Sequence, residues 1–397
     1  MLTVFTMVLF VAAVPVLLIA AYLGALTAMW RRPVPVAPSD SRWLAVLVPA
    51  HNEAGGITRT IASLRASDYR QGRRRIIVIA DNCTDDTAAI ARAAGAEVIE
   101  RHDAARRGKG YALQTAIDQL LTEPAEAWDS LVVVDADTEV DANTFKVLAG
   151  HLATGADAVQ AAYLPTPGTT PTSVLTDVAF AAFHLVRSGA RERLGLSCGL
   201  RGNGMAFSRT LLAAVPHTAH SRTEDLEFGV QLGLRGIRVA FAGDTRVRGE
   251  MPERAAVVTR QRERWIGGRA AIARTWLGSL LRQAWTTRSV MALDLAIDLI
   301  VPPISAVVMA AAAGLMCSLA VWALGGSAVP AWMFAASLVI IAAHAALAAV
   351  LVGRSRDLLR ALGHVPAYAW GKAVIAMRGL RRTPEVWVRT TREGESL

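Results

Sequence analysis

The chain has 397 residues, of which 53% are hydrophobic and only 19% are charged. This is more apolar material than a soluble domain of that length needs, so we expect membrane segments. The net charge of +9 accompanies no basic-aromatic nucleic-acid-binding module, which favours anionic lipid headgroups over nucleic acid as partners. The three cysteines have no metal-ligand spacing and imply neither a disulfide nor a zinc site.

The N-terminal segment from Val4 to Trp30 carries no charge and is long enough to cross a hydrocarbon core of about 30 Å. A secretory signal is the alternative interpretation. Such a signal begins with basic residues and has an apolar run of only about 7 to 15 residues, unlike this segment. We therefore predict that residues 1–32 form an N-terminal transmembrane helix.

Residues 43–285 alternate short β-branched runs with Ala-rich polar stretches, a pattern typical of an α/β domain whose mostly parallel sheet is covered by helices. Most of the expected strands are continuous apolar runs of the buried type. The strands are expected at 44–48, 75–80, 97–100, 130–135, 158–163 and 239–242, and helices at 56–66, 85–94 and 110–121.

A loop is expected at 165–171, which is rich in Pro, Gly and Thr. The next segment, 172–196, mixes apolar side chains with Arg187, Arg191 and Arg193. It is predicted to be either an amphipathic helix at the membrane surface or a helix packed on the sheet.

The C-terminal part of the chain is predicted to return to the membrane. Residues 286–298 are expected to form an interfacial helix, and residues 299–352 hold two apolar blocks that predict a transmembrane helical hairpin. Residues 353–397 form a basic cytosolic or interfacial tail, in which 365–377 is expected to lie in the interface plane.

The basic residues predict the orientation of these spans. Arg31 and Arg32 follow the first span, and Arg354, Arg356 and Arg360 follow the third. Cytoplasmic loops carry an excess of Lys and Arg, so the middle of the chain and the C-terminus are placed in the cytosol. We predict a multi-pass protein of the inner (plasma) membrane.

The strongest chemical signal is Asp135-Ala136-Asp137, which directly follows a predicted buried strand. It delivers two carboxylates to the C-terminal edge of the sheet, where ligands bind in open α/β sheets. A hard cation such as Mg²⁺ or Mn²⁺ takes oxygen ligands and can join these carboxylates to substrate phosphates. The alternative is that the two aspartates cap a following helix.

Three other polar motifs point to the same edge. They are Val48-Pro49-Ala50-His51-Asn52-Glu53, Ile79-Ala80-Asp81-Asn82 and Arg107-Gly108-Lys109-Gly110. The first two end predicted strands. In the third, a lysine flanked by glycines at a helix start offers a cation and backbone N–H groups to a phosphate.

In their order along the chain these motifs resemble those of family 2 glycosyltransferases with the GT-A fold, in the membrane-bound branch of cellulose, hyaluronan and poly-N-acetylglucosamine synthases. The resemblance covers residues 48–269 and includes Thr223-Glu224-Asp225 and Gln261-Arg262-Glu263-Arg264-Trp265. It implies a Rossmann-like cytosolic GT-A domain, a nucleotide-sugar donor with UDP as the usual nucleotide, and Mg²⁺ or Mn²⁺ as cofactor. One departure is His51, where many relatives carry Tyr.

The resemblance also assigns roles residue by residue. Nucleotide binding is implied for Pro49, Glu53, Asp81, Lys109 and Asp135, and metal binding for Asp135 and Asp137. Asp225 is the implied general base, which takes a proton from the acceptor hydroxyl, and its alternative role is helix capping.

Contacts with the acceptor or the diphosphate are implied for Asn203, Glu224, Gln261, Arg264 and Trp265. Asn203 lies in Cys198-Gly199-Leu200-Arg201-Gly202-Asn203-Gly204, which resembles an acceptor-side glycine-rich loop. Trp265 can stack on a sugar ring and Arg264 can neutralise the departing diphosphate. A membrane-interface belt of Trp and Arg is the alternative interpretation.

These roles predict a single displacement that inverts the anomeric centre. The resemblance favours growth of a polysaccharide chain at the cytosolic membrane face, as in exopolysaccharide biosynthesis. The alternative is one addition to a lipid such as a polyprenyl phosphate, ceramide or diacylglycerol, because three spans are few for a polysaccharide pore. An accessory membrane subunit stays open as a partner. An inactive scaffold is disfavoured by the intact motifs, and a transporter by the lack of paired ionisable residues in the spans.

Overall fold

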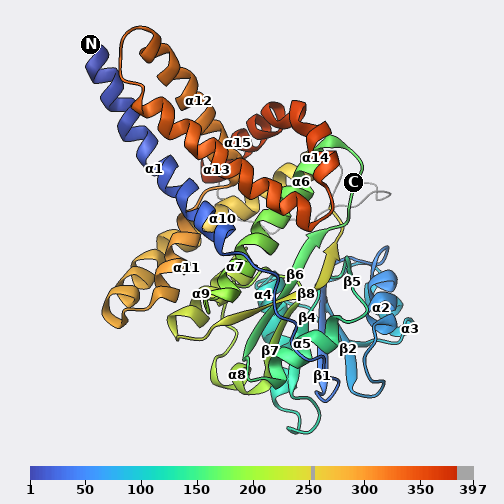
Figure 1. Cartoon of the computed structure of the whole chain (residues 1–397). Helices are drawn as coiled ribbons and strands as arrows, with labels where there is room; N and C mark the ends of the chain where they lie inside the picture. The colour runs from blue at the N-terminus through green and yellow to red at the C-terminus, as the bar shows by residue number, and fades with distance from the viewer. Residues whose placement is uncertain (252–254, 382–397) are drawn as a thin grey trace. The chain divides into compact units, whose positions relative to one another are not determined.

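The computed structural model describes residues 1–251 and 255–381 (Figure 1). The chain divides into two compact units. The first, here called the helical unit, comprises Met1–Arg31, Pro167–Leu194 and Ile300–Arg381. The second, here called the sheet unit, includes Arg32–Thr166 and Gly195–Leu299.

The described residues of the sheet unit form an eight-stranded mixed sheet of order β3-β2-β1-β4-β7-β6-β8-β5. The strands are β1 (Leu44–Ala50), β2 (Arg74–Asp81), β3 (Glu97–Arg101), β4 (Ser130–Val133), β5 (Thr138–Val140), β6 (Ala158–Pro165), β7 (Met205–Ser208) and β8 (Val239–Gly249). β3, β2, β1 and β4 are parallel. β7 is antiparallel to both β4 and β6, while β5 is antiparallel to β8. The predicted α/β class is confirmed.

All six strands expected from the sequence are present, and two further strands were not expected. β5 has three residues and β7 has four. Neither is long enough to give a periodic pattern, and both depend on pairing with strands that come from elsewhere in the chain. β7 inserts antiparallel between β4 and β6, which makes the sheet mixed.

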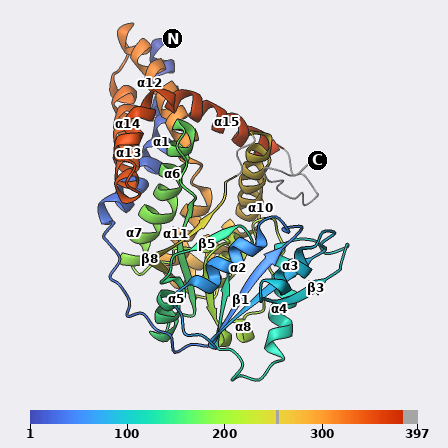
Figure 2. The same cartoon turned by 90° about the vertical axis from the view of Figure 1, so that its right-hand side faces the viewer.

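Helices cover the sheet because each has an apolar face. The helices of the sheet unit are α2 (Ile57–Ala66), α3 (Thr87–Ala93), α4 (Lys109–Leu121), α5 (Thr144–Ala153), α8 (Arg209–Ala214), α9 (Glu224–Leu234), α10 (Ala255–Thr287) and α11 (Val290–Ile300). In α2 the buried positions Ile57, Thr60, Ile61 and Leu64 recur at helical spacing. α2 and α5 share one apolar core with the sheet (Figure 2).

α11 packs on α9 and α10. Leu295 and Leu299 of α11 share a core with Val230 of α9 and with Ile272 and Leu280 of α10. This helix coincides with most of the segment that was expected to be interfacial. Its place at a membrane interface stays a prediction.

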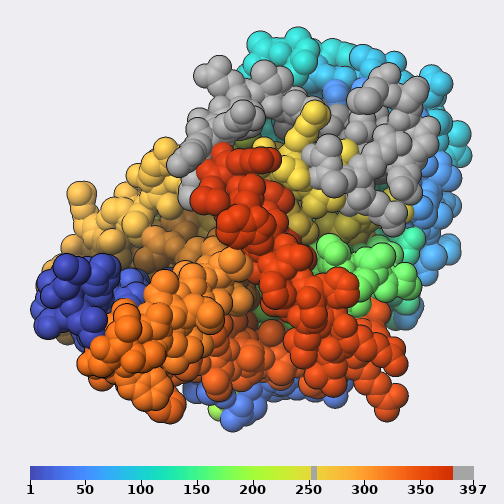
Figure 3. Space-filling view, turned by 90° about the horizontal axis from the view of Figure 1, so that it is seen from above, coloured from blue at the N-terminus to red at the C-terminus, as the bar shows by residue number. Residues whose placement is uncertain are grey.

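Three helices among the described residues have the length and apolar composition to cross a membrane: α1 (Leu2–Met29), α12 (Ile304–Ala323) and α13 (Val329–Leu351). They pack together at small residues, since Ala13 and Ala311 share a core with Phe334. Such residues allow the helices to approach closely. Figure 3 shows the dark blue N-terminal end of α1 beside the orange helices.

The second predicted span begins later than expected, at Ile304 and not at residue 299. Leu299 and Ile300 instead belong to α11. The cause is Pro302-Pro303, because proline disfavours a helical conformation in the residue before it and cannot continue the helix.

The segment expected at 172–196 is helical. It forms α6 (Pro171–Ala181), a π-helical turn η1 (Ala182–Arg187) and α7 (Ser188–Arg193). It belongs to the helical unit and contacts α13. The remaining elements of this unit are α14 (Ser355–Ala361), η2 (Leu362–His364) and α15 (Val365–Arg381). Their placement relative to a membrane surface stays a prediction.

Candidate active site

Lys109 lies at the centre of a charged cluster at the C-terminal edge of the sheet. Its Nζ is 2.5 Å from Asp135 Oδ1 and 3.6 Å from Glu224 Oε1. It also donates a hydrogen bond of 2.5 Å to the carbonyl oxygen of Gly202. Asp225 is close by, because a Cβ added to Gly202 would lie 3.2 Å from Asp225 Oδ2 and 3.7 Å from Lys109 Nζ. We call Lys109, Asp135, Glu224 and Asp225 the Lys109 cluster.

The residues of the Lys109 cluster come from three elements that end or begin at this edge. Lys109 is the first residue of α4, after Gly108 with φ +126°, a conformation that favours glycine. Asp135 follows β4, and Glu224 and Asp225 occupy the first turn of α9. Parallel strands and helix N-termini therefore bring together residues that are distant in sequence.

Burial and charge oppose each other within the cluster. Burial lowers the pKa of Lys109, but Asp135 and Glu224 raise it, and the net pKa lies above its usual range. Lys109 is therefore a cation at neutral pH. Burial raises the pKa of Glu224 and of Asp225, although the positive charge of Lys109 opposes the rise. A carboxylate with a raised pKa accepts a proton more readily, as a general base must.

Asp135 and Asp137 do not cap a helix. The next element is β5, which starts at Thr138, and the next helix, α5, starts only at Thr144. The capping alternative is therefore wrong. Both side chains are half-buried at the strand end, where they offer carboxylate oxygens.

These two aspartates suit a divalent cation that is shared with a substrate. Among residues 1–251 and 255–381, no group of three or more His, Cys, Asp or Glu side chains forms a complete metal cage. Mg²⁺ is commonly held by one or two carboxylates plus substrate phosphates, and that arrangement needs no such cage. The donor set of this site therefore fits a hard cation.

Asn203 stabilises the turn at Asp135 through two hydrogen bonds. It is fully buried, its Oδ1 accepts a hydrogen bond of 3.2 Å from the Asp135 N–H, and its Nδ2 donates one of 2.7 Å to Thr138 Oγ1. The structure thus brings Asn203 to the turn that carries Asp135. The expected acceptor contact of Asn203 is left as a prediction.

Gln160 and Tyr163 are site residues that the sequence did not single out. Gln160 is fully buried in β6. Its Oε1 accepts a hydrogen bond of 2.8 Å from the Arg201 N–H, and its Nε2 donates one of 2.7 Å to the Asn203 carbonyl oxygen. Burial is the main cause that raises the pKa of Tyr163 well above its usual value, and the negative charges of Asp137 and Asp135 raise it further. The available signal was a polar residue inside a predicted buried strand.

The ends of β1 and β2 form a second polar group, where the nucleotide was expected. Asp81 is buried, and its Oδ1 accepts a hydrogen bond of 2.6 Å from Arg101 Nη1 and one of 2.9 Å from Asn82 Nδ2. His51 Nδ1 lies 2.6 Å from the Asp81 carbonyl oxygen. Arg101, at the end of β3, was not identified from the sequence.

Asn52 and Asn82 have positive φ values of 56° and 51°, an uncommon conformation at the ends of two adjacent strands. The backbone N–H of Glu53 donates a hydrogen bond of 2.7 Å to Thr87 Oγ1, which fixes the position of the Glu53 backbone. Pro49 sits in β1 opposite Ile79 of β2. The predicted nucleotide residues thus share one edge of the sheet.

Gln261, Arg264 and Trp265 lie on α10, and all three are half-buried. Arg264 Nε is buried and has no hydrogen-bond partner within the described part of the chain. A buried guanidinium N–H without a partner is costly, and an anionic ligand would satisfy it. This observation agrees with the diphosphate contact expected for Arg264.

α10 approaches the start of α9 at Gly268, three residues after Trp265. A Cβ added to Gly268 would lie 2.6 Å from Thr223 Cγ2 and 2.9 Å from Thr223 Oγ1. Thr223 directly precedes Glu224 and Asp225. The contact therefore fixes the distance between the Gln261-x-x-Arg264-Trp265 motif and the proposed base.

Gly268→Ala is expected to lower both the melting temperature and kcat, because overpacking of this kind typically costs about 1–3 kcal/mol. Gly278→Ala is the matched control, since no atom lies within 4 Å of a Cβ added there on the same helix. Alanine stabilises a helix interior over glycine by up to about 1 kcal/mol, so Gly278→Ala should be neutral or stabilising. Thermal unfolding and turnover of the two variants are compared. Equal behaviour of the two would contradict the close approach.

A family model described as "Glycosyltransferase like family 2" matches residues 41–268. The chain is 27% identical over 240 residues to the β-monoglucosyldiacylglycerol synthase of Synechocystis sp. (strain ATCC 27184 / PCC 6803 / Kazusa), a match that covers 57% of this chain and 47% of that protein. The chain thus spans about half the length of this curated relative.

Two solved structures are also similar. The mannosyltransferase PcManGT from Pyrobaculum calidifontis, in complex with GDP-Man and Mn²⁺, has a TM-score of 0.56 and 18% identity, with 95% of this chain and 99% of that chain covered. This likeness shows a shared fold. The glucosyl-3-phosphoglycerate synthase from Mycobacterium tuberculosis, in complex with Mn²⁺, UDP and phosphoglyceric acid, has a TM-score of 0.39 and 27% identity, with 58% of this chain and 81% of that chain covered.

Proposed function

The chain belongs to the glycosyltransferase-like family 2, and we propose that it transfers a sugar from a nucleotide-sugar donor to a hydroxyl of a membrane acceptor in one inverting displacement. The Lys109 cluster is the observation that carries this proposal. It places one half-buried cation between the carboxylates of Asp135 and Glu224, with Asp225 beside it. A diphosphate leaving group, a metal ion and a general base need these groups within a few ångströms of one another.

Asp135 and Asp137 are the proposed holders of Mg²⁺ or Mn²⁺. Both offer hard oxygen donors at the strand end, as these cations require. When bound, the ion neutralises charge on the departing diphosphate. Lys109 adds a fixed positive charge on the same side, and Arg264 donates hydrogen bonds to the phosphate oxygens.

Asp225 is the proposed general base. It accepts the proton of the acceptor hydroxyl as the oxygen attacks the anomeric carbon. The raised pKa of its carboxyl favours this proton transfer. Attack from the side opposite the leaving group inverts the anomeric configuration, so an α-linked donor gives a β-linked product.

The nucleotide is proposed to lie at the ends of β1 and β2, against Pro49, Glu53 and Asp81. Arg101 holds the Asp81 carboxylate at 2.6 Å and fixes its direction. UDP is the proposed nucleotide. Gln261 and Trp265 are proposed to line the acceptor side, with the indole ring stacked on a sugar.

We favour a lipid acceptor and a single addition. The curated relative that shares 27% identity is named as a glucosyldiacylglycerol synthase, which supports this alternative over polymer growth. Polysaccharide elongation is the second candidate, and the Gln261-x-x-Arg264-Trp265 motif on α10 is the feature that favours it. Basic residues after α1 and α13 support a cytosolic catalytic domain at the inner membrane.

The function is tested with purified full-length protein, Mg²⁺ or Mn²⁺, and a panel of labelled nucleotide sugars. Diacylglycerol, ceramide, polyprenyl phosphate and oligosaccharide primers are offered as acceptors. We expect one donor to release free nucleoside diphosphate and to give a lipid-extractable product that is one sugar longer. A ladder of lengthening saccharides would instead support polymer growth. Absence of diphosphate release with every donor and acceptor would refute the proposed transfer.

A further inference from the structure

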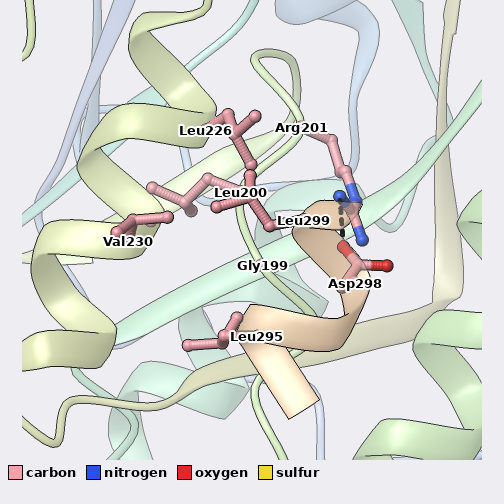
Figure 4. A pocket seen from close by; sticks show the side chains of 9 residues that line it. Gly199, Leu200, Arg201, Leu226, Val230, Leu295, Asp298 and Leu299 are labelled. Carbon is pink, nitrogen blue, oxygen red and sulfur yellow. Dashed lines mark ion pairs between the residues drawn. The ribbon is translucent and has the colours of Figure 1, made fainter. Parts of the chain in front are cut away.

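A buried carboxylate, Asp298, joins three segments behind the Lys109 cluster. Its Oδ2 lies 3.9 Å from Arg201 Nη1 and 3.7 Å from Arg269 Nη2, and Figure 4 shows the pair with Arg201. The side chains of Asp298 and Arg201 are only 6% and 5% exposed. Arg269 also donates to the backbone carbonyls of Asp298 and Leu299. We call Asp298, Arg201 and Arg269 the Asp298 triad.

The surroundings of the triad are mostly apolar. The Arg201–Asp298 pair borders a hollow whose other lining residues are Gly199, Leu200, Leu226, Gly229, Val230, Leu295 and Leu299 (Figure 4). Aliphatic residues of similar volume would pack here as well as a buried ion pair or better, because burying charges costs solvation free energy. Stability alone therefore does not account for charges at this place. An orientation role does.

The triad is connected to the site through Arg201. Its Nη2 donates 2.7 Å to the Cys198 carbonyl, and its backbone N–H donates 2.8 Å to Gln160 Oε1. The next residue is Gly202, whose carbonyl accepts the hydrogen bond from Lys109 and whose Cα faces Asp225. The guanidinium also acts on the base itself, because its positive charge lowers the pKa of Asp225 against the dominant effect of burial.

α9 and α11 complete the link. Asp225 and Gly229 lie one turn apart on α9, and a Cβ added to Gly229 would lie 3.2 Å from the Leu200 backbone nitrogen. The glycine-rich loop of residues 198–204 is thus in contact with the helix that carries the base. Asp298 of α11 holds the guanidinium of Arg201 on the other side of this loop.

We propose that Asp298 is a positioning residue for the transfer reaction. By pairing with Arg201 it fixes the glycine-rich loop, and so the Gly202 carbonyl, against Lys109 and Asp225. Asp298 touches neither donor nor acceptor and acts through Arg201. The inference rests on the proposed function, since its effect on turnover is exerted on the proposed base.

The test is a double-mutant cycle with Asp298→Asn and Arg201→Gln in the full chain. Each single variant is expected to lower kcat about tenfold, a typical coupling for residues in contact, with the donor KM within about twofold of wild type. The double variant should be no slower than the slower single variant, because the two residues act as one unit. Asp298→Glu, which keeps the charge, should recover most of kcat.

Asp294→Asn is the matched control, since Asp294 lies one turn earlier on α11 and is buried like Asp298. The fold-loss of kcat in Asp294→Asn should multiply with that in Arg201→Gln when the two substitutions are combined. If the kcat losses of Asp298→Asn and Arg201→Gln also multiplied in their double variant, the positioning role would be overturned. A lower melting temperature of Asp298→Asn with kcat unchanged would overturn it as well.

A second readout does not depend on turnover. Amide hydrogen exchange of residues 198–204 is expected to be faster in Asp298→Asn than in wild type. In Asp298→Glu and in Asp294→Asn the exchange of this loop is expected to match that of wild type. Unchanged exchange of the loop in Asp298→Asn refutes the inference even where the wild type is active. Conversely, a wild type that transfers no sugar refutes the proposed function, and the exchange data still decide whether Asp298 positions the loop.

Discussion

Asp225→Asn is expected to lower kcat by about 10²–10⁴-fold, the range that general acid–base catalysis supplies. The amide keeps the shape of the side chain but cannot take the proton of the acceptor hydroxyl. Binding of the nucleoside diphosphate should stay within about twofold of wild type, because the proposed diphosphate contacts come from Lys109, Arg264 and the metal. Turnover with labelled donor and calorimetric titration with the diphosphate measure the two quantities.

Glu227→Gln is the matched control for this substitution. Glu227 occupies the same first turn of α9, but its carboxylate accepts a hydrogen bond of 2.9 Å from the Ser221 N–H, outside the Lys109 cluster. Removing the charge of this carboxylate weakens its hydrogen bond, which is expected to lower the free energy of unfolding by about 0.5–1.5 kcal/mol and to leave kcat near the wild-type value. If Glu227→Gln were the slower variant, the base would have to be reassigned.

The pH dependence gives an independent check of the same residue. Burial raises the pKa of the Asp225 carboxyl above 3.8, the ordinary value for aspartic acid. A base works only when ionised, so activity should be present above the raised pKa and be lost as pH falls through it. The acid limb of kcat against pH is therefore expected above the range of an exposed aspartate, and Asp225→Asn should abolish this limb.

Asp137→Asn is expected to remove metal-dependent turnover. In the wild type, a chelator should abolish activity and Mn²⁺ or Mg²⁺ should restore it. A bound metal ion contributes several kcal/mol of charge stabilisation on the leaving diphosphate, so its loss is expected to lower kcat by about 10²-fold or more. Metal titrations of activity, and of Mn²⁺ binding in the presence of UDP, measure the effect.

Asp141→Asn serves as the control for metal binding. Asp141 lies four residues beyond Asp137, but its Oδ1 pairs at 2.5 Å with Arg248. The pair is about one third exposed, so its loss is expected to cost at most about 1 kcal/mol and to leave the metal dependence unchanged. Full activity of Asp137→Asn at low metal concentration would show that this carboxylate is not a ligand.

The sequence was informative where a property belongs to a short segment. The apolar runs at 44–48 and 75–80 predicted β1 and β2, since a buried parallel strand needs a continuous apolar stretch. Residues at the end of such a strand share an edge, which brought Asp135 into the predicted site. The start of α12 was misplaced because the apolar composition of residues 299–303 concealed the break at Pro302-Pro303.

Residues that act through long-range contacts were missed. Gln160 lay inside a predicted apolar strand, and only the pairing of β6 with β7 shows that it holds the loop of residues 198–204. Arg101 resembled an ordinary surface residue in the sequence, yet it is buried against Asp81. β7 itself gave no periodic signal, because four residues are too few for one.

The sequence by itself determined the α/β class, the membrane-length helices and the edge of the sheet that carries Asp135, Asp137 and Lys109. Hydrophobic periodicity and strand ends are local, so one segment at a time is enough to read them. Only the tertiary structure decided that Lys109 lies between Asp135 and Glu224, and that Asp298 holds Arg201. These contacts join segments far apart in the chain, and packing, not local pattern, selects which of them meet.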